Sequence, residues 1–262
     1  MARSSAAALI LLGLALAGLA CTKSEEAKPT ETQPLAPAPT VVAPAPTGPT
    51  GTIQGMVVLG GTPPKMLPLP RQSDPICAMR QVNSNFVTVG AGGGLADVLV
   101  RLPLGKAKGP VPATPVTIDQ KVCMYLPHVV GAVIGQKIAI TNSDPTTHNI
   151  HGYIGDETMF NEAQPPGAGA IKKSAAGEPG EVLKLTCDVH KWMESHIVMT
   201  DHPFFQVTRD DGAFTLANVP VGTYEVEAWH PHVGTLQKVS VTVEAGKTTA
   251  AQFRFQAAEY KP

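Results

Sequence analysis

The sequence has little net charge, few aromatic residues and no long amphipathic helical pattern after residue 50. Its formal net charge is −1, and charged residues make up 16% and aromatic residues 5% of 262 residues. A nucleic-acid-binding protein carries a basic patch or stripe that would show in this balance, so we expect no nucleic-acid partner. The second half is rich in Val, Thr and Gly-containing turns, which predicts an all-β fold.

Cysteine is scarce as well. The chain has Cys21, Cys77, Cys123 and Cys187, and no two of them form a CxxC pair. This spacing argues against a zinc ribbon and against a thioredoxin-type dithiol. Each cysteine therefore needs its own explanation.

The N-terminal apolar run, residues 6–19, is shorter than the about 20 residues that a membrane-spanning helix needs. Arg3 precedes the run and small residues follow it, which predicts a signal peptide over residues 1–20. The sequence before Cys21 resembles a bacterial lipoprotein signal, although Gly18 stands where Leu is usual. The resemblance implies lipidation of Cys21. An ordinary secretory signal with an incidental cysteine is the alternative.

A lipid on Cys21 would anchor the chain at the periplasmic face of a bacterial membrane, and we expect the outer membrane rather than the inner one. Residues 21–51 are rich in Pro, Thr and Ala and have no core-forming period. Such a linker is extended, at about 3.1 Å per residue where it forms polyproline II. It is either a tether that lets the folded part reach its partners or a passive spacer.

Residues 52–114 are predicted to contain strands at 52–58 and 96–102 with Pro-rich loops between and after them. Cys77 lies in the intervening loop. Because disulfides persist in exported proteins, we expect a bridge between Cys77 and Cys123. The alternative is Cys123 as a second thiolate ligand of a metal, which would leave Cys77 unexplained.

Cys187, His190 and Met193 are spaced three residues apart in a loop that follows a predicted strand at 182–186. An upstream His-Asn-Ile-His segment, His148 to His151, follows another predicted strand at 138–142. Two imidazoles, one thiolate and a weak axial thioether are the ligands of a blue-copper site. Side chains alternate along a strand, so His148 and His151 should point to opposite faces. One of them is therefore a ligand candidate and the other structural.

These two segments resemble the cupredoxins, most closely the amicyanin type, over residues 115–203. The resemblance implies a Greek-key β-sandwich that binds one mononuclear type 1 copper. The implied ligands are His148, Cys187, His190 and Met193, and the implied role of Asn149 is to donate its backbone N–H toward the cysteine sulfur.

Other interpretations of the same residues are a buried core thiol with packing neighbours, or a zinc site, for which Met is a poor ligand. A binuclear copper centre needs two cysteines in the loop. A multicopper oxidase needs histidines beside the cysteine, where Thr186 and Asp188 stand. We therefore expect no enzymatic activity. Trp192 either packs the loop or couples electron transfer.

Residues 204–262 contain the pattern D-G-x-F-x-L followed by V-P-x-G-T-Y, which resembles the carboxypeptidase regulatory-like, transthyretin-like β-sandwich module. The resemblance implies a scaffold without catalysis. A hairpin with an Asp-Gly turn is predicted over residues 207–216. The strands at 52–58 and 96–102 would complete the sheets of this module, which makes the copper domain an insertion.

The six other histidines have no spacing that requires a metal. His230 and His232, two apart at a strand end, could bind a second metal, but an exposed pair without a ligand is expected. His196 is expected to be structural or solvent-facing. His128 and His202 have no matching partner in the sequence, and His151 is the structural member of its pair if His148 is the ligand.

The function predicted from these observations is electron transfer between a periplasmic dehydrogenase or cytochrome c and another carrier at the membrane. A copper-binding or copper-delivery protein without redox turnover would use the same ligands. A scaffold in which the metal only stabilises the fold is the third possibility.

Overall fold

The computed structural model describes residues 48–103, 109–234 and 236–261. The predicted signal peptide, the lipidation of Cys21 and the linker up to residue 47 lie outside the described residues. Within the described residues, no helix is both long enough and apolar enough to cross a membrane. The described residues belong to one compact unit.

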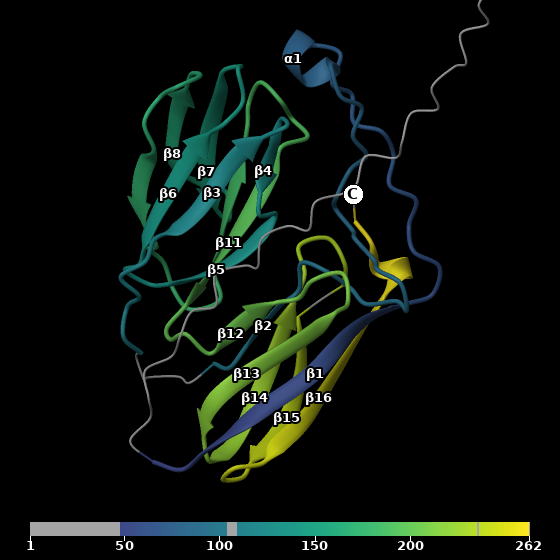
Figure 1. Ribbon diagram of the computed structural model, residues 1–262, viewed down its shortest axis with the longest axis vertical. Helices are drawn as coiled ribbons and strands as arrows, with labels where there is room; N and C mark the ends of the chain where they lie inside the picture. The colour runs from purple at the N-terminus through teal and green to yellow at the C-terminus, as the bar shows by residue number, and fades with distance from the viewer. Residues whose placement is uncertain (1–47, 104–108, 235, 262) are drawn as a thin grey trace, which may run out of the picture. The chain divides into compact units, whose positions relative to one another are not determined.

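Residues 116–200 form a sandwich of two sheets (Figure 1). The first sheet has the order β4-β3-β6-β9 and contains β3 (Val116–Lys121), β4 (Met124–Leu126), β6 (Lys137–Asn142) and β9 (Ile171–Ser174). The second sheet has the order β5-β11-β10-β7-β8 and contains β5 (Val129–Val133), β7 (His148–Ile154), β8 (Glu157–Gln164), β10 (Val182–Thr186) and β11 (Glu194–Thr200). The all-β prediction is confirmed.

The core of this sandwich follows from the alternation of apolar and polar residues along its strands. In β3, Val116 and Ile118 are buried and the intervening Thr117 is exposed. Period-two alternation places one face of a strand in the core and the other toward solvent. The facing sheet contributes Leu185 and Ile197, which are fully buried in the same cluster.

Strands from before and after residues 116–200 build a second sandwich. One sheet has the order β13-β1-β16 and contains β1 (Thr50–Gly60), β13 (Ala213–Pro220) and β16 (Thr248–Gln256). The other has the order β12-β2-β14-β15 and contains β2 (Leu99–Arg101), β12 (Phe205–Val207), β14 (Gly222–Trp229) and β15 (Gln237–Val243).

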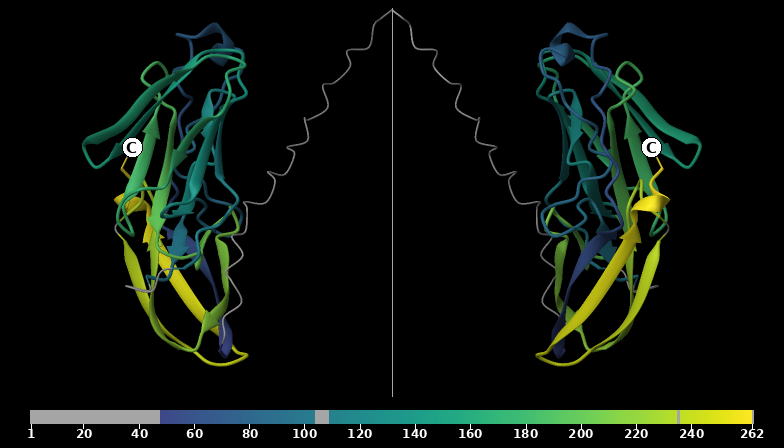
Figure 2. Two further views of the ribbon diagram at one scale, coloured as in Figure 1. Left: turned by 90° about the vertical axis from the view of Figure 1, so that its left-hand side faces the viewer. Right: turned by 90° about the vertical axis from the view of Figure 1, so that its right-hand side faces the viewer.

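The first and last strands pair in parallel from Thr52↔Thr248 to Gly60↔Gln256. They are the purple and yellow arrows that lie side by side in Figure 1 and can be followed in both side views of Figure 2. The residues of the first sandwich thus lie, in sequence, between strands β2 and β12 of the second sandwich, which pair with each other.

The predicted hairpin over residues 207–216 is wrong. β12 pairs with β2 and β13 pairs with β1, so the two segments lie in different sheets. The turn between them is fixed to β1, because the carbonyl of Gly212 accepts a hydrogen bond from Val57 N–H at 2.8 Å. Phe214 and Leu216 are then buried in the second core. Alternation along the strand predicted the buried face but not the partner strand.

One buried strand contributes to two clusters. All five residues of β5 are buried. Val130 and Ala132 belong to the core of the first sandwich, while Val129 packs with Leu99 of β2 and Val198 of β11 in a separate cluster. A strand that is apolar on both faces must be covered on both faces. The cluster of Leu99, Val129 and Val198 contains residues of both sandwiches.

A short helix, α1 (Pro75–Ala78), lies in the long connection between β1 and β2. Asp74 caps it by accepting hydrogen bonds from the N–H groups of Ile76 at 2.7 Å and Cys77 at 3.1 Å. Cys77 and Cys123 form a disulfide with a Cα–Cα distance of 5.7 Å. The bridge ties the helix to the first sandwich. A 3₁₀ turn (Ala257–Glu259) follows β16.

Candidate metal centre

The residues of the predicted ligand set come from two adjacent strands and the loop that joins one of them to a third. His148 opens β7, and Cys187 directly follows β10, which pairs with β7 and β11. The loop is closed on itself, because Met193 N–H donates to the carbonyl of His190 at 2.8 Å. Its end leads straight into β11 at Glu194.

The structure brings three donor atoms together. His148 Nδ1 lies 2.9 Å from His190 Nδ1, and Cys187 Sγ lies 3.7 Å from the same His190 Nδ1. All three side chains are fully buried, and one donor atom of each lies within 4.8 Å of the others. Two imidazoles and one thiol that converge in this way fit a copper ion of the blue type.

The Nε2 atom of each imidazole is hydrogen-bonded to a carboxylate. His148 Nε2 lies 2.9 Å from Asp144 Oδ2, and His190 Nε2 lies 3.2 Å from Asp74 Oδ2. A carboxylate can only accept, so each Nε2 carries the proton and donates it. Nδ1 is then the nitrogen of each ring that faces the site. A metal ion would take the place of any proton between the two Nδ1 atoms and bind both lone pairs. Carboxylates of this kind orient metal-binding histidines in proteins.

The thiol is strongly acidified. Burial alone would raise the pKa of Cys187, but hydrogen bonds with His148, His190 and the backbone of Asn149 lower it to about 5. For His148, burial alone would lower the pKa, while Asp144 and Cys187 raise it to about 9. The thiolate is the form of cysteine that ligates metals.

Met193 is fully buried in the same core cluster as Cys187. Its carbonyl accepts a hydrogen bond from Cys187 N–H at 3.4 Å, which holds the two ends of the loop together. The side chain of Asn149 also braces the loop, since its Oδ1 accepts from Asp188 N–H at 2.7 Å and lies 3.3 Å from Cys187 Sγ. The backbone of Asn149 is hydrogen-bonded to the sulfur as well.

His148 and His151 point to opposite faces of β7. His148 is fully buried, whereas His151 is part-exposed and its Nδ1 lies 3.1 Å from both carboxylate oxygens of Asp188. Asp188 directly follows Cys187 in the chain. His151 therefore lies outside the cluster of His148, Cys187 and His190, which we call the donor cluster. It contacts the exposed side of the loop from residue 187 to residue 193, which we call the ligand loop.

Cys123 is not available as a second thiolate, because it is bonded to Cys77. Trp192 packs against this bridge region, and its Nε1–H donates to the carbonyl of Cys123 at 2.9 Å. Its ring centroid lies 5.1 Å from that of His190. Trp192 is only 7% exposed, so its indole is part of the core beneath the loop.

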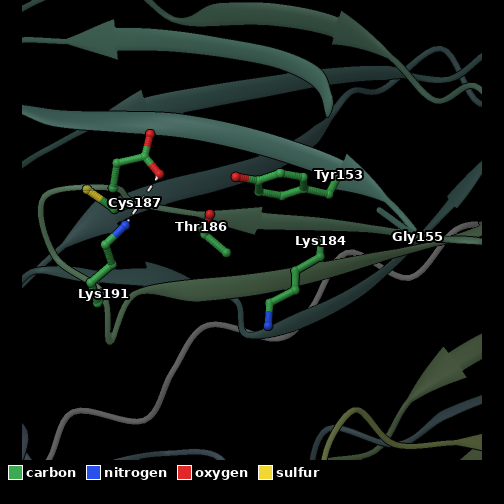
Figure 3. Close-up of a pocket in the computed structure, with 7 residues that line it drawn as sticks. Tyr153, Gly155, Lys184, Thr186, Cys187 and Lys191 are labelled. Carbon is green, nitrogen blue, oxygen red and sulfur yellow. Dashed lines mark ion pairs between the residues drawn. The ribbon is translucent and has the colours of Figure 1, made fainter. Parts of the chain in front are cut away.

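A surface depression of about 350 Å³ lies beside Cys187. Figure 3 shows Tyr153 of β7 and Lys184 and Thr186 of β10 beside the depression. Lys191 lies near Cys187 in the same view. The dashed line in the figure is the 3.7 Å ion pair between Lys191 and Asp188. The charged side chains of Asp188 and Lys191 therefore line the depression together with Cys187.

Sequence reasoning did not assign the carboxylates of Asp74 and Asp144. For Asp144 a signal exists, because it lies four residues before His148 in the turn that precedes β7. For Asp74 there is none, since 116 residues separate it from His190. The long connection between β1 and β2 has no periodic pattern that would reveal where it packs.

Two histidines outside the ligand set are placed differently from expectation, whereas a buried His196 agrees with its predicted structural role. The prediction of an exposed His230 and His232 pair is wrong, because these residues are 3% and 9% exposed. They follow the end of β14 at Trp229 rather than lying on it. His196 is buried too, at 6%. The ring of His196 lies edge-on to Trp229 and to His232, and the ring of His230 lies near Phe255.

Comparisons with known proteins find one family model and several solved structures that are similar to parts of this chain. A family model described as polysaccharide lyase family 4, domain II, matches residues 169–251. This match covers less than half of the chain and extends from β9 to β16. A comparison with curated proteins finds no match.

Three solved structures illustrate the likeness in fold. A copper-containing nitrite reductase from Thermus scotoductus SA-01 is 18% identical over 37% of this chain and 25% of its own, with a TM-score of 0.30. A purple cupredoxin from Nitrosopumilus maritimus is 19% identical over 32% of this chain and 99% of its own, with a TM-score of 0.26. A reduced amicyanin mutant is 13% identical over 36% of this chain and 99% of its own, with a TM-score of 0.29.

The chain thus spans about a quarter of the nitrite reductase and nearly all of the two small cupredoxins. At these identities the likeness concerns the fold alone. The part of the chain with the converging histidines and cysteine is a β-sandwich of a five-stranded and a four-stranded sheet.

Proposed function

We propose that the chain is a mononuclear blue-copper electron-transfer protein, anchored by a lipid on Cys21 at the periplasmic face of a bacterial membrane. One observation carries the proposal. The Nδ1 atoms of His148 and His190 and the Sγ atom of Cys187 converge in a fully buried cluster. Met193, in the same loop and equally buried, would supply a thioether as the fourth ligand.

The donor types suit a metal that changes its oxidation state. When bound, copper supplies a one-electron couple between Cu(I) and Cu(II). The thiolate of Cys187 and the thioether of Met193 suit the softer Cu(I), and imidazoles suit both states. A ligand set with these two preferences supports reversible electron transfer.

Several residues would hold the ligands in place through both states. Asp144 and Asp74 orient the two imidazoles by accepting from their Nε2–H groups. Tyr125 links the two strands of the site, because its hydroxyl lies 2.7 Å from the carbonyl of Asn149 and 3.3 Å from that of Thr186. Ligands fixed by such outer contacts move little, which lowers the reorganisation cost of gaining or losing an electron.

The first test is the visible absorption spectrum of the Cu(II)-loaded protein. We expect an intense thiolate-to-copper band that bleaches on reduction and is absent in Cys187→Ser. His148→Gln should also lose the band. His151→Gln is the matched control, because the same substitution three residues along β7 changes a part-exposed ring outside the donor cluster, and it should keep the band.

Tight but colourless binding of copper or zinc would exclude the electron-transfer proposal. Copper delivery, or a metal that only stabilises the fold, would then explain the same ligands. An irreversible couple in cyclic voltammetry of a coloured protein would also contradict the proposal, since a carrier must accept and release its electron repeatedly.

The proposed redox partner is a periplasmic dehydrogenase or a cytochrome c that docks on the ligand loop. The loop presents Val189, which is 62% exposed, between the charged side chains of Asp188 and Lys191. An exposed apolar residue with a charged rim is typical of a transient interface. Val189→Asp should slow electron exchange with a soluble c-type cytochrome while the absorption band stays unchanged. An unchanged exchange rate would place the docking surface elsewhere.

The anchor is tested separately by Cys21→Ser. The variant should move from the membrane fraction to the soluble periplasmic fraction, because a lipid is the proposed link to the membrane. Density-gradient separation of the wild-type membranes distinguishes the outer from the inner membrane. A Cys21→Ser variant that stays with the membranes would overturn the lipid anchor without affecting the proposal for the copper site.

A further inference from the structure

A second cluster of metal-binding groups lies outside the candidate copper site. His128 immediately precedes β5, Glu194 opens β11, and His232 lies in the loop after β14. One donor atom of each lies within 4.8 Å of the others. The side chains of His128, Glu194 and His232 are only 3%, 10% and 9% exposed. We call these three residues the His128–Glu194–His232 cluster.

The hydrogen bonds at Nδ1 of the two histidines turn the Nε2 atom of each ring toward Glu194. His128 Nδ1 lies 3.1 Å from Asp97 Oδ2, and His232 Nδ1 lies 3.1 Å from the carbonyl oxygen of Lys261. Both partners can only accept, so each Nδ1 carries the proton. Both Nε2 atoms face Glu194 Oε1, and His232 Nε2 donates a hydrogen bond to it. A metal ion would take the place of the protons on these nitrogens and bind their lone pairs.

The His128 Nε2 atom lacks a hydrogen-bond partner although it is buried. It lies 3.6 Å from Glu194 Oε1, too far for a good hydrogen bond. A buried polar atom without a partner costs free energy, and such an atom in a folded protein calls for an explanation such as a bound ion. The outer contact of His128 with a carboxylate is the arrangement that orients metal-binding histidines.

Aromatic rings enclose the cluster. Phe86 stacks on His232 with ring centroids 4.4 Å apart, and the ring of His128 lies parallel to His232 at 5.7 Å. His196 stands edge-on to both at 5.5 and 5.9 Å, and its Nδ1 is buried without a hydrogen-bond partner. The second oxygen of Glu194 is paired with Lys184 at 2.9 Å. Only Oε1 of Glu194 therefore points into the cluster.

His230 is close but is not a ligand. Its Nδ1 accepts hydrogen bonds from the N–H groups of His232 and Val233, both at 3.1 Å. A nitrogen that accepts must hold the lone pair, so the Nε2 atom of neutral His230 carries the proton. His230 consequently has no lone pair to offer the cluster.

We propose that the His128–Glu194–His232 cluster is a second metal site, which binds a divalent ion of the zinc type through two imidazole Nε2 atoms and one carboxylate oxygen. Two histidines and one glutamate are a known zinc ligand set that leaves a fourth position for water or a small ligand. The cluster has no thiolate or thioether, so the metal ions that it prefers differ from those that the Cys187 site prefers. Met193 and Glu194 are consecutive, and a single peptide unit joins the two sites.

The test uses the full chain with Cys187→Ser, so that no thiolate competes for the probe. Zn²⁺ affinity is measured by competition with a chromophoric chelator, and Co²⁺ spectra report the geometry of the bound ion. We expect a tight Zn²⁺ equivalent that is weakened more than about 100-fold by His232→Gln and by His128→Gln, since loss of an outer-shell partner alone costs about 10–100-fold. His230→Gln is the matched control in the same loop and should keep the affinity.

Asp97→Asn gives a test with less risk to folding. Asp97 has a φ of 60°, a conformation that Asn tolerates well, and the substitution removes only the charge that faces His128. Zn²⁺ affinity should fall about 10-fold. The proposal is overturned if His232→Gln, folded by circular dichroism, binds Zn²⁺ as tightly as its parent, or if His230→Gln weakens binding equally. It is also overturned if the Cys187→Ser protein binds no Zn²⁺. None of these outcomes depends on whether the Cys187 site binds copper.

Discussion

Asp74 Oδ2 lies 3.2 Å from Nε2 of His190, although 116 residues separate the two in the chain. The same oxygen accepts the hydroxyl of Thr146 at 2.8 Å, and the other carboxylate oxygen caps α1. Asp74 therefore connects the helix, the turn before β7 and the ligand loop. Desolvation by burial opposes ionisation, but these hydrogen bonds keep the pKa of Asp74 below its usual value.

Asp74→Asn should raise the reduction potential of the copper-loaded protein. The carboxylate stabilises the oxidised state, which carries one more positive charge, and its loss costs on the order of 1 kcal/mol at a partly exposed site. The blue absorption band should persist, because Asn can still accept from His190. A spectroelectrochemical titration measures the shift. Asp156→Asn, the same change in an exposed turn, is the control, and an equal shift in both variants would contradict a specific role for Asp74.

Removal of the disulfide should destabilise the metal-free protein. Cys77→Ser/Cys123→Ser opens a link with a sequence separation of 46 residues. In the chain-entropy model such a link contributes about 4 kcal/mol to the free energy of unfolding. Urea unfolding measures the loss. Cys187→Ser replaces another buried cysteine without opening a link, and a double variant no less stable than this control would refute the prediction.

Trp192→Phe should lower stability and leave the copper band unchanged. The substitution removes the Nε1–H donor to the carbonyl of Cys123. A buried acceptor left without a partner costs about 1–3 kcal/mol. Chemical unfolding of the metal-free variant checks the loss. Electron exchange with a small-molecule reductant checks the other interpretation, since a slower exchange at unchanged stability would make Trp192 a coupling group.

His230 should make the metal-free protein less stable in mild acid. Burial, followed by the charges of His128, His232 and His196, lowers the pKa of His230 from 6.5 to about 3. Between these values the unfolded chain binds the proton and the folded chain does not, so stability falls as pH falls below about 6.5. The loss approaches about 1.4 kcal/mol per pH unit within the window.

His230→Gln should therefore flatten the pH dependence of the unfolding free energy between pH 6 and pH 4. Urea unfolding of the chelator-treated wild type and variant at each pH provides the comparison. His151→Gln is the control, because this part-exposed ring lies in a different environment. Parallel curves for the wild type and His230→Gln would show that the buried ring does not carry the effect.

The local features of this protein follow from short stretches of its sequence. Cys187, His190 and Met193 fall in one loop because they are only three residues apart. His148 and His151 face opposite sides of β7 because side chains alternate along a strand. The Val-rich and Thr-rich segments with Gly turns determined an all-β fold. These features depend only on neighbours within a few residues.

The contacts between residues far apart in the chain follow from the folded structure and could not be read from local patterns. It placed Asp74 on His190, and it assembled His128, Glu194 and His232 from three separate segments. It also paired β13 with β1 in place of the expected hairpin. Periodicity in a sequence specifies the face of a strand that is buried, but the partner that covers this face is chosen by the packing of the whole chain.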